Sequence, residues 1–350
     1  MRMAYIEPTQ DQWMALYQAA EEYKRHELWK FMTDNQVFGV KDPHRGKTGF
    51  CTVIGNAGQM YGLVVYLGLE GLHVLCEMYR RGDDIMQDPD FMYQQDTFVM
   101  SFGGREELLP WDLKTIKKLG LKYRGLNAWP SFARHLPGYY PWRLTADEAG
   151  FMTEILQQAA IVGERYLQDP DCLPPMQSNW YLIRIKGSDG WQDQLTECLP
   201  QKPEGNRASD IPVAQRAIED ILAMNLKRQG EWEVDCFYGP VYIHESETER
   251  PYFAYMLAVM DCRNGMALSM ETAAPGNYAE PFMKKVLATM RNVRTVPQKI
   301  YYQRDEIFSL FSSVAEKLGI RLSRVKQLNM VSDFRQGLDK YFSKNRGKDR

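Results

Sequence analysis

The pattern of apolar and polar residues is clearest between residues 49 and 72. Two apolar runs rich in β-forming residues, 50–54 and 60–67, flank the turn-forming residues 55–58, and this arrangement predicts a β-hairpin. Both faces of the second run are apolar, which is typical of a central strand that is covered on both sides. Apolar residues at helical spacing over 72–79 then predict a helix that packs on this sheet.

Local sequence signals predict further elements in the first half of the chain. A capping-box sequence at residues 9–12 precedes an apolar stripe, so we expect a helix over about 10–25. Thr145 with Glu148 predicts the start of a long helix that ends near Asp169. Strands are expected at 37–40, 97–102 and 179–186, and a short helix at 111–119.

The second half of the chain alternates strands and helices in a defined order. After a helix over 211–229, the pattern predicts strands at 231–238, 252–260 and 266–272, a helix at 278–291, a strand at 299–303, a helix at 306–318 and a strand near Val325. This order, β-β-β-α-β-α-β, is similar to the ribonuclease-H-like core of integrases and transposases.

These elements indicate an α+β protein with two domains. We expect the first to be a mostly antiparallel sheet with flanking helices, and the second to be a ribonuclease-H-like β-β-β-α-β-α-β core. Proline, glycine and polar residues are frequent between 170 and 210 and indicate the boundary. The predicted parts are an N-terminal α+β domain over 1–170, a strand and linker region over 171–210, a C-terminal α/β domain over 211–343 and a basic tail over 344–350.

Several unusual strings in the first half carry a family resemblance. They are D-P-x-x-G-K-x-G-x-C-x-V-x-G from Asp42, YGLVVYLGLEGL from Tyr61, R-G-x-N-A-W-P from Arg124 and P-G-Y-x-P-W from Pro137. With the Trp-containing N-terminal helix, they resemble a bacterial and archaeal family whose members pair an N-terminal domain of unknown function with a second such domain. The resemblance runs from about Trp13 to Leu328 and implies no activity.

Composition agrees with a globular protein. The chain has 350 residues, 44% of them hydrophobic, which is enough for two buried cores. Its apolar runs are shorter than the roughly 18–20 residues that span a bilayer, and the first ten residues contain no apolar signal segment, so we expect a cytoplasmic location without membrane contact. The six cysteines form no C-x-x-C pair, and we expect reduced core residues and not zinc ligands.

Charge is distributed unevenly along the chain. From Lys284 onward there are 16 Lys or Arg and 6 Asp or Glu, a net charge of +10, whereas residues 1–283 carry −12. Two interpretations stay open. The basic residues either form a solvated helix face and a frayed tail, or they make weak contacts with nucleic acid.

One segment, residues 124–143, combines aromatic and basic residues. Pro130, Pro137 and Pro141 exclude a regular helix or a central strand here. Aromatic rings beside arginines can bind a protein or peptide partner or stack on bases, and they can equally pack over a sheet. The candidate binding residues are Arg124, Trp129, Phe132, Arg134, Tyr139, Tyr140, Trp142 and Arg143.

Candidate catalytic residues come only from the ribonuclease-H-like resemblance. It implies a metal-binding Asp on the first strand, which is Asp235 here, and the other candidates are Asp305 and Asp333. Two-metal phosphodiester chemistry needs about three converging carboxylates. The expected Asp-Asn-Gly after the fourth strand is absent, and Asp305 is placed to cap the following helix. We therefore expect no metal and no cofactor.

The sequence supports two hypotheses about function. The first is a binding protein of the cytoplasm without enzymatic activity, which contacts a protein or peptide partner through residues 124–143. The alternative is a nucleic-acid-binding or nucleic-acid-processing protein with a degenerate ribonuclease-H-like domain. Clustering of Asp235 with Asp305 would favour the alternative, and scattered acids would favour the first.

Overall fold

The structure, a computed structural model, describes residues 5–202, 212–246 and 249–345. The chain divides into two compact units. The first comprises Met1–Pro137 and Pro141–Lys202, and the second comprises Gly138–Tyr140 and Pro203–Arg350. None of the helices in the described ranges has the length and apolar composition that crossing a lipid bilayer requires.

The first unit is built on a seven-stranded sheet in the order β5-β4-β3-β2-β1-β6-β7. Neighbouring strands are antiparallel except for β1 and β6, which are parallel. The sheet is therefore mostly antiparallel, as predicted. Its strands are β1 (Val37–Lys41), β2 (Thr48–Ile54), β3 (Tyr61–Leu67), β4 (Thr97–Gly103), β5 (Trp129–His135), β6 (Trp180–Gly187) and β7 (Gly190–Glu197).

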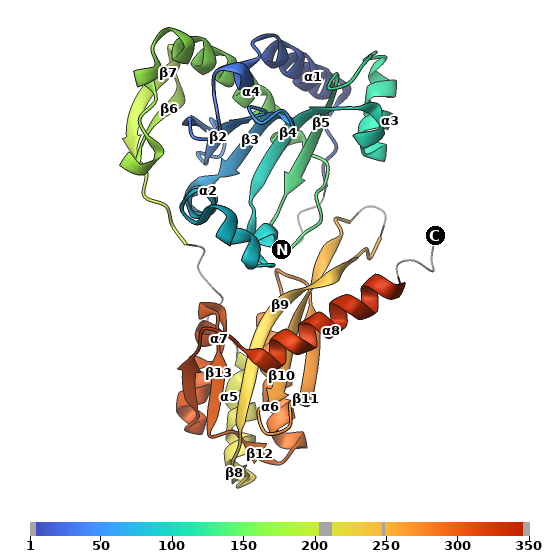
Figure 1. Ribbon diagram of the computed structural model, residues 1–350, viewed down its shortest axis with the longest axis vertical. Helices are drawn as coiled ribbons and strands as arrows, with labels where there is room; N and C mark the ends of the chain where they lie inside the picture. The colour runs from blue at the N-terminus through green and yellow to red at the C-terminus, as the bar shows by residue number, and fades with distance from the viewer. Residues whose placement is uncertain (1–4, 203–211, 247–248, 346–350) are drawn as a thin grey trace. The chain divides into compact units, whose positions relative to one another are not determined.

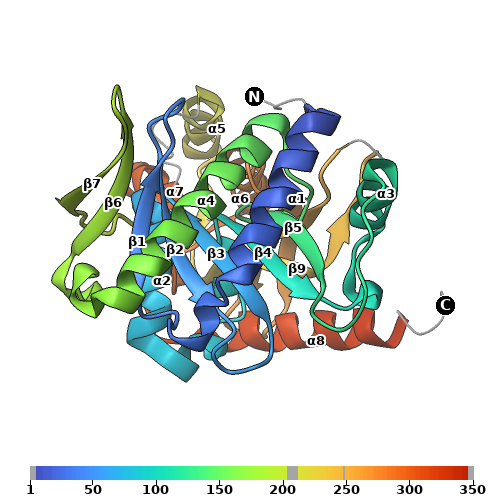
Figure 2. The same cartoon turned by 90° about the horizontal axis from the view of Figure 1, so that it is seen from above.

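Helices cover both faces of this sheet. In Figure 1 α1 and α4 lie on one face and α2 lies on the other, and Figure 2 shows α1 and α4 side by side across the strands. The α-helices are α1 (Gln10–Arg25), α2 (Gly68–Arg81), α3 (Pro110–Leu119) and α4 (Ala146–Gln168). The 3-10 helices are η1 (Leu28–Lys30), η2 (Gly82–Gln87), η3 (Phe91–Gln94), η4 (Arg105–Glu107), η5 (Pro170–Cys172) and η6 (Met176–Ser178).

Two capping boxes define where the long helices begin. The Thr9 hydroxyl accepts the Gln12 backbone N–H at 3.2 Å, and the Gln12 side chain accepts the Thr9 N–H at 2.9 Å. Thr145 and Glu148 make the same reciprocal pair before α4. Each box satisfies two N–H groups that the first helical turn leaves without partners. The predicted starts of both helices are confirmed.

Strand β3 contributes to a core on each face of the sheet. Leu63 and Val65 are fully buried on the side of α1 and α4. Tyr66 is buried on the side of α2, where Val64 is only half-buried. The predicted hairpin and its central second strand are confirmed, except that one position on the α2 side is partly open.

Two strands of this sheet differ from the predictions. The segment 124–143, in which the prolines exclude a regular helix or a central strand, contains the edge strand β5, which was not predicted and which tolerates Pro130 because it lies at the edge of the sheet. The hairpin of β6 and β7 extends the same sheet through the region 171–210 that the sequence sets apart. Strand β7 was not predicted, because most of its side chains are polar and exposed.

The second unit holds a five-stranded sheet in the order β11-β10-β9-β13-β14. Strands β9, β10 and β11 are antiparallel neighbours, whereas β9, β13 and β14 run parallel. The predicted order of these elements is present. The strands are β9 (Glu231–Ile243), β10 (Tyr252–Asp261), β11 (Ala267–Ala273), β13 (Lys299–Tyr302) and β14 (Arg321–Arg324), and β8 (Lys227–Arg228) pairs with β12 (Thr295–Val296) separately.

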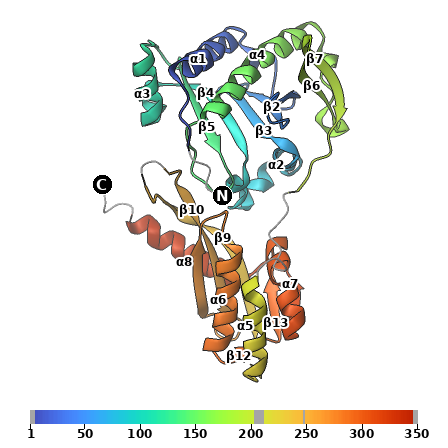
Figure 3. The same ribbon diagram turned by 180° about the vertical axis from the view of Figure 1, so that it is seen from behind.

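Helices also cover both faces of the second sheet. Helices α5, α6 and α7 pack on one face, on which Trp232, Val234 and Cys236 of β9 are buried. Figure 3 shows α5 and α6 on this side, and Figure 1 shows α8 crossing the opposite side. These helices are α5 (Pro212–Ala223), α6 (Ala279–Asn292), α7 (Asp305–Leu318) and α8 (Asn329–Asn345).

Helix α8 and the end of α5 correct the predictions. Helix α8 was not predicted, although Val331 and its neighbours pack on Phe237 and the other apolar residues of that face. Helix α5 ends at Ala223 and not at 229, because Asn225 adopts a left-handed conformation that terminates helices. The predicted cap Asp305 is the first residue of α7, after the N-cap Arg304.

We predict that Val65→Asp unfolds the first domain. Val65 is fully buried in the middle of β3, so the new carboxylate has neither water nor a cation beside it. The free energy of unfolding should fall by about 3 kcal/mol or more, as measured by urea unfolding.

Met60→Asp serves as the control. Met60 directly precedes β3 and is 49% exposed, so its carboxylate stays in water and stability should change by less than about 0.5 kcal/mol. If Val65→Asp unfolds at the same urea concentration as the unmodified protein, β3 is not the core strand described above.

Candidate functional site

Three of the eight candidate binding residues of segment 124–143 are buried. Phe132, Arg134 and Trp142 expose 8% or less of their surface. The Phe132 ring meets the Tyr17 ring edge-on, with 5.2 Å between the ring centres. These three side chains belong to the core of the first unit, which favours packing over partner contact at their positions.

Arg134 is held by two carboxylates. Its guanidinium pairs with Asp96, and its Nε lies 3.1 Å from Glu148 Oε1. Another nitrogen donates to the Thr97 carbonyl at 3.2 Å. A buried charge needs such partners, because without them its removal from water costs several kcal/mol. Arg134 therefore joins β5 to the start of α4 and to the residue before β4.

Trp142 pairs with β5 through a single isolated β-bridge to Arg134. Its backbone N–H donates to the Arg134 carbonyl at 3.0 Å, and the Arg134 N–H donates back at 2.7 Å. Its ring lies 5.2 Å from the Trp111 ring, centre to centre. Backbone and side chain together fix Trp142 in the fold.

The remaining candidates are more accessible but separated. Arg124 is exposed, Trp129 is half-buried beside Tyr123, and the Arg143 guanidinium lies 4.0 Å above the centre of the Tyr5 ring. Tyr139 and Tyr140 belong to the second unit, in which Tyr139 forms a β-bridge with Tyr252 and the Tyr140 ring lies 4.8 Å from the Tyr242 ring. The eight residues thus divide between two units.

The candidate acid Asp235 is buried and faces an arginine. It lies on β9, on the face opposite Val234 and Cys236, and is 4% exposed. Arg304 Nε lies 3.7 Å from Asp235 Oδ2. The same guanidinium donates to the Cys236 carbonyl at 2.6 Å. A cation supplied by the chain therefore neutralises this carboxylate.

The other two candidate acids have different surroundings. Asp305 pairs with Arg324 Nη1 at 2.9 Å, and Asp333 is exposed on α8. Glu233, which the sequence did not single out, accepts the backbone N–H groups of Met330 and Val331 at 2.9 and 3.0 Å and so caps α8. Across the described residues, no three or more His, Cys, Asp or Glu gather in a way that could hold a metal ion.

Asp112, in the first turn of α3, is a buried acid that the sequence analysis missed. It is 3% exposed, and its Oδ2 has no hydrogen-bond partner among the described residues. Burial raises the pKa of Asp112 to about 7, against the opposing effect of hydrogen bonds from the Leu109 and Phe132 backbones. Acids are common in the first turn of helices, so the sequence contains no signal that this one is buried.

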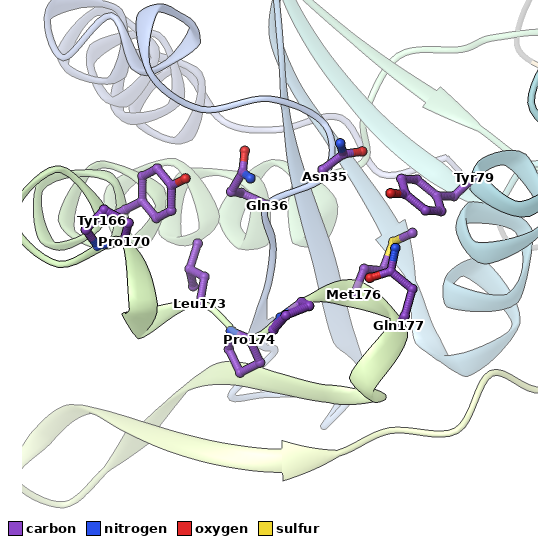
Figure 4. A pocket seen from close by; sticks show the side chains of 10 residues that line it. Asn35, Gln36, Tyr79, Tyr166, Pro170, Leu173, Pro174, Met176 and Gln177 are labelled. Carbon is purple, nitrogen blue, oxygen red and sulfur yellow. The ribbon is translucent and has the colours of Figure 1, made fainter.

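A cavity of about 220 Å³ opens in the first unit (Figure 4). Asn35 and Gln36 line it from the turn before β1, Tyr79 from the end of α2 and Tyr166 from the end of α4. The segment 170–177 supplies the remaining side chains, which are prolines, Leu173, Met176 and Gln177. The tyrosines lie on opposite sides of the cavity, and both hydroxyls point into it. These residues carry no common signal in the sequence, because they come from three distant segments, 35–36, 79 and 166–177.

We predict that Trp142→Ala lowers the free energy of unfolding by about 3–5 kcal/mol, since the change empties a site in the core. Thermal or urea unfolding of the purified variant measures the loss. Leu126→Ala is the control in the same segment, because Leu126 is 83% exposed and its removal should leave stability nearly unchanged. If the two variants are equally stable, Trp142 is not a core residue and is again a candidate for partner contact.

We predict a pH-dependent stability that comes from Asp112. The unfolded chain releases the Asp112 proton near pH 4, whereas the folded protein keeps it until about pH 7. The folded state therefore binds more protons between these values. Its free energy of unfolding should fall with rising pH in this window, by up to about 1.4 kcal/mol per pH unit from this group, and should not change further above it.

The Asp112→Asn variant tests this prediction, because it keeps the shape of the side chain but cannot ionise. Urea unfolding between about pH 4.5 and 7.5 should show a stability that falls less with pH than in the unmodified protein. Asp189→Asn, at an exposed turn between β6 and β7, should not alter the slope. Identical slopes for Asp112→Asn and the unmodified protein would show that Asp112 is already ionised when folded.

Comparison with protein families agrees with the two units. Residues 13–184 match the family model of a domain of unknown function (DUF7309), and residues 218–339 match that of a second domain of unknown function (DUF6930). No curated protein matches the chain. The chain therefore has the two-domain arrangement that its sequence resembles, with DUF7309 followed by DUF6930.

Proposed function

We propose that this protein acts in the cytoplasm by binding a protein or peptide partner and that it does not catalyse nucleic-acid cleavage. In this proposal the second domain is a ribonuclease-H-like scaffold in which an internal ion pair replaces the metal centre. The contact between Asp235 and Arg304 is the observation that carries the proposal.

The topology around Asp235 supports the scaffold part of the proposal. Strand β9 is central, with the antiparallel strand β10 on one side and the parallel strand β13 on the other. In open sheets with helices on both faces, ligands bind beyond the carboxyl ends of parallel strands where the strand order changes direction. Arg304 lies there, two residues after β13 ends, and reaches back to Asp235 on β9.

Electrostatics support the absence of metal chemistry. A two-metal site requires several carboxylates that hold two cations about 3.5–4 Å apart. Here one buried carboxylate faces one guanidinium, whose positive charge opposes the binding of a divalent cation at short range. Asp305 is paired with Arg324, and Asp333 is exposed on α8.

In the first domain, the accessible residues of segment 124–143 contact the partner. Arg124 is exposed and Trp129 is half-buried, and both lie at or before the start of the edge strand β5. Because Trp142 already pairs with Arg134, only the part of this edge near Trp129 is offered to a peptide, and there an aromatic ring and a cation add side-chain contacts to those of the backbone.

A second candidate function is weak nucleic-acid binding by the second domain. Arg321, Arg324 and Lys326 are exposed along the edge strand β14 and the residues after it. Such a row of cations attracts phosphates without sequence preference. The end of the predicted basic tail, residues 346–350, lies outside the described residues.

We predict that the purified protein with Mg²⁺ or Mn²⁺ cleaves neither DNA nor RNA, single- or double-stranded, because a single buried acid beside a cation cannot hold two metal ions. Denaturing gels after prolonged incubation measure cleavage. In parallel native gels, any binding should weaken steeply with added salt and should decrease in an Arg321→Ala, Lys326→Ala double variant.

Matched variants make both measurements decisive. Lys117→Ala with Lys118→Ala removes two exposed cations from α3 and should leave nucleic-acid binding unchanged. Metal-dependent cleavage that disappears in both Asp235→Asn and Asp305→Asn would overturn the proposal, because it would show that these acids form an active centre.

A further inference from the structure

The side chains that line the cavity of Figure 4 are polar but uncharged. Asn35, Gln36 and Gln177 supply three primary amides, and Tyr79 and Tyr166 supply two phenols. The other five lining residues are prolines, a leucine and a methionine, so none of the ten described lining residues is a Lys, Arg, His, Asp or Glu. The cavity therefore offers hydrogen-bond donors and acceptors together with apolar contact, but no counter-ion.

This lining restricts the chemistry of a ligand. A charged ligand would lose water without gaining an ion-pair partner, which is unfavourable. A purely apolar ligand would cover the amides and phenols without replacing their hydrogen bonds to water. The fitting ligand is neutral, carries both donors and acceptors, and has an apolar face for the Pro174 and Met176 side of the cavity.

The size of the cavity restricts the ligand further. Pockets for drug-sized molecules enclose about 300–1,000 Å³. A cavity of about 220 Å³ suits a smaller ligand, of one ring system. Asn and Gln amides match the donor and acceptor pattern on the edge of a nucleobase, and the Tyr79 and Tyr166 hydroxyls that point into the cavity can each donate or accept a further hydrogen bond.

Hydrogen bonds hold two sides of the cavity in place before a ligand arrives. Gln36 Oε1 accepts from the Thr33 backbone N–H at 2.7 Å and from the Thr33 hydroxyl at 2.9 Å, which leaves the Gln36 Nε2 group as the donor that faces a ligand. On the opposite side, the Tyr181 hydroxyl donates to the Met176 carbonyl at 3.2 Å. Such preorganisation lowers the entropy that binding costs.

From these observations we infer that the cavity between Tyr79 and Tyr166 binds a single neutral nucleobase. The base comes either as a free nucleoside or as an unstacked base of a single strand. The inference goes beyond the proposed function, since it concerns only the first domain and requires neither the ion pair in the second domain nor the edge strand β5.

Titration calorimetry with adenosine, guanosine, cytidine and uridine, each added to the full-length protein, tests the inference. At least one nucleoside should bind with a saturable heat signal. Tyr79→Ala and Gln177→Ala should each weaken that binding about tenfold, through loss of a phenol and of an amide that line the cavity. Tyr79 is 46% exposed and Gln177 is exposed, so both variants should fold, and thermal unfolding of each variant checks this.

Controls outside the cavity are available for both variants. Tyr341→Ala removes a tyrosine that is 62% exposed on α8, and Gln194→Ala removes an exposed glutamine on β7. Neither should change nucleoside binding. A short single-stranded oligonucleotide distinguishes the two sources, because tighter binding than the nucleoside, with the same loss in Tyr79→Ala, identifies the strand as the ligand.

Three results would overturn the inference. These are no binding of any nucleoside or oligonucleotide, binding that is unchanged in both Tyr79→Ala and Gln177→Ala, and equal binding of glucose as a non-planar neutral ligand. The nuclease assay above is independent of all three, so the inference can fail while the proposed function holds, and the reverse is also true.

Discussion

The central strands of the first sheet carry apolar side chains on both faces, so water has to be excluded from both. Val65 and its neighbours meet α1 and α4, and Tyr66 meets the layer that contains α2. Burial of apolar surface is the largest favourable contribution to folding, and a sheet with two apolar faces obtains it only between two layers of helices. This requirement fixes where α1, α2 and α4 lie, and the edges of the sheet are left for strands with more polar or irregular sequences.

Ionisable groups inside these layers are accommodated in three ways. Arg134 is surrounded by two carboxylates, and Asp235 is balanced by the guanidinium of Arg304. Asp112 has no cation beside it in the contacts that the structure records, and burial shifts its pKa instead, so that it stays protonated below about pH 7. The second way bears on function, because a carboxylate already neutralised by the chain is a poor ligand for a metal ion.

Local signals in the sequence predicted much of the fold. The boxes at Thr9 and Thr145 and the alternation in β3 depend only on nearby residues, and these elements are where the patterns placed them. Strand β7 carries mostly exposed polar side chains, so its pairing with β6 left no apolar pattern to detect. Helix α8 has an apolar stripe that includes Val331, but charged residues interrupt it along the chain.

The sites were less predictable, because they depend on contacts between distant segments. That Arg134 is buried depends on Asp96 and Glu148, which come from other elements. The sequence identified Asp235 through a resemblance, but no local pattern indicates that Arg304 reaches it from the end of β13. Residue type and spacing show which groups are able to act, whereas the charge around each group is set by the tertiary fold.

The position of the cavity depends on the parallel pairing of β1 with β6 in the first sheet. Because β1 and β6 run in the same direction, both begin at the same end of the sheet, and the segments that enter them lie near each other. One of these is the turn with Asn35 and Gln36, and the other is the proline-rich segment 170–177. Helices α2 and α4, from opposite faces, end there with Tyr79 and Tyr166 among their last turns. Prolines cannot extend either helix or join a strand ladder, so the segment forms only the short 3-10 helices η5 and η6, and its side chains line this end of the sheet.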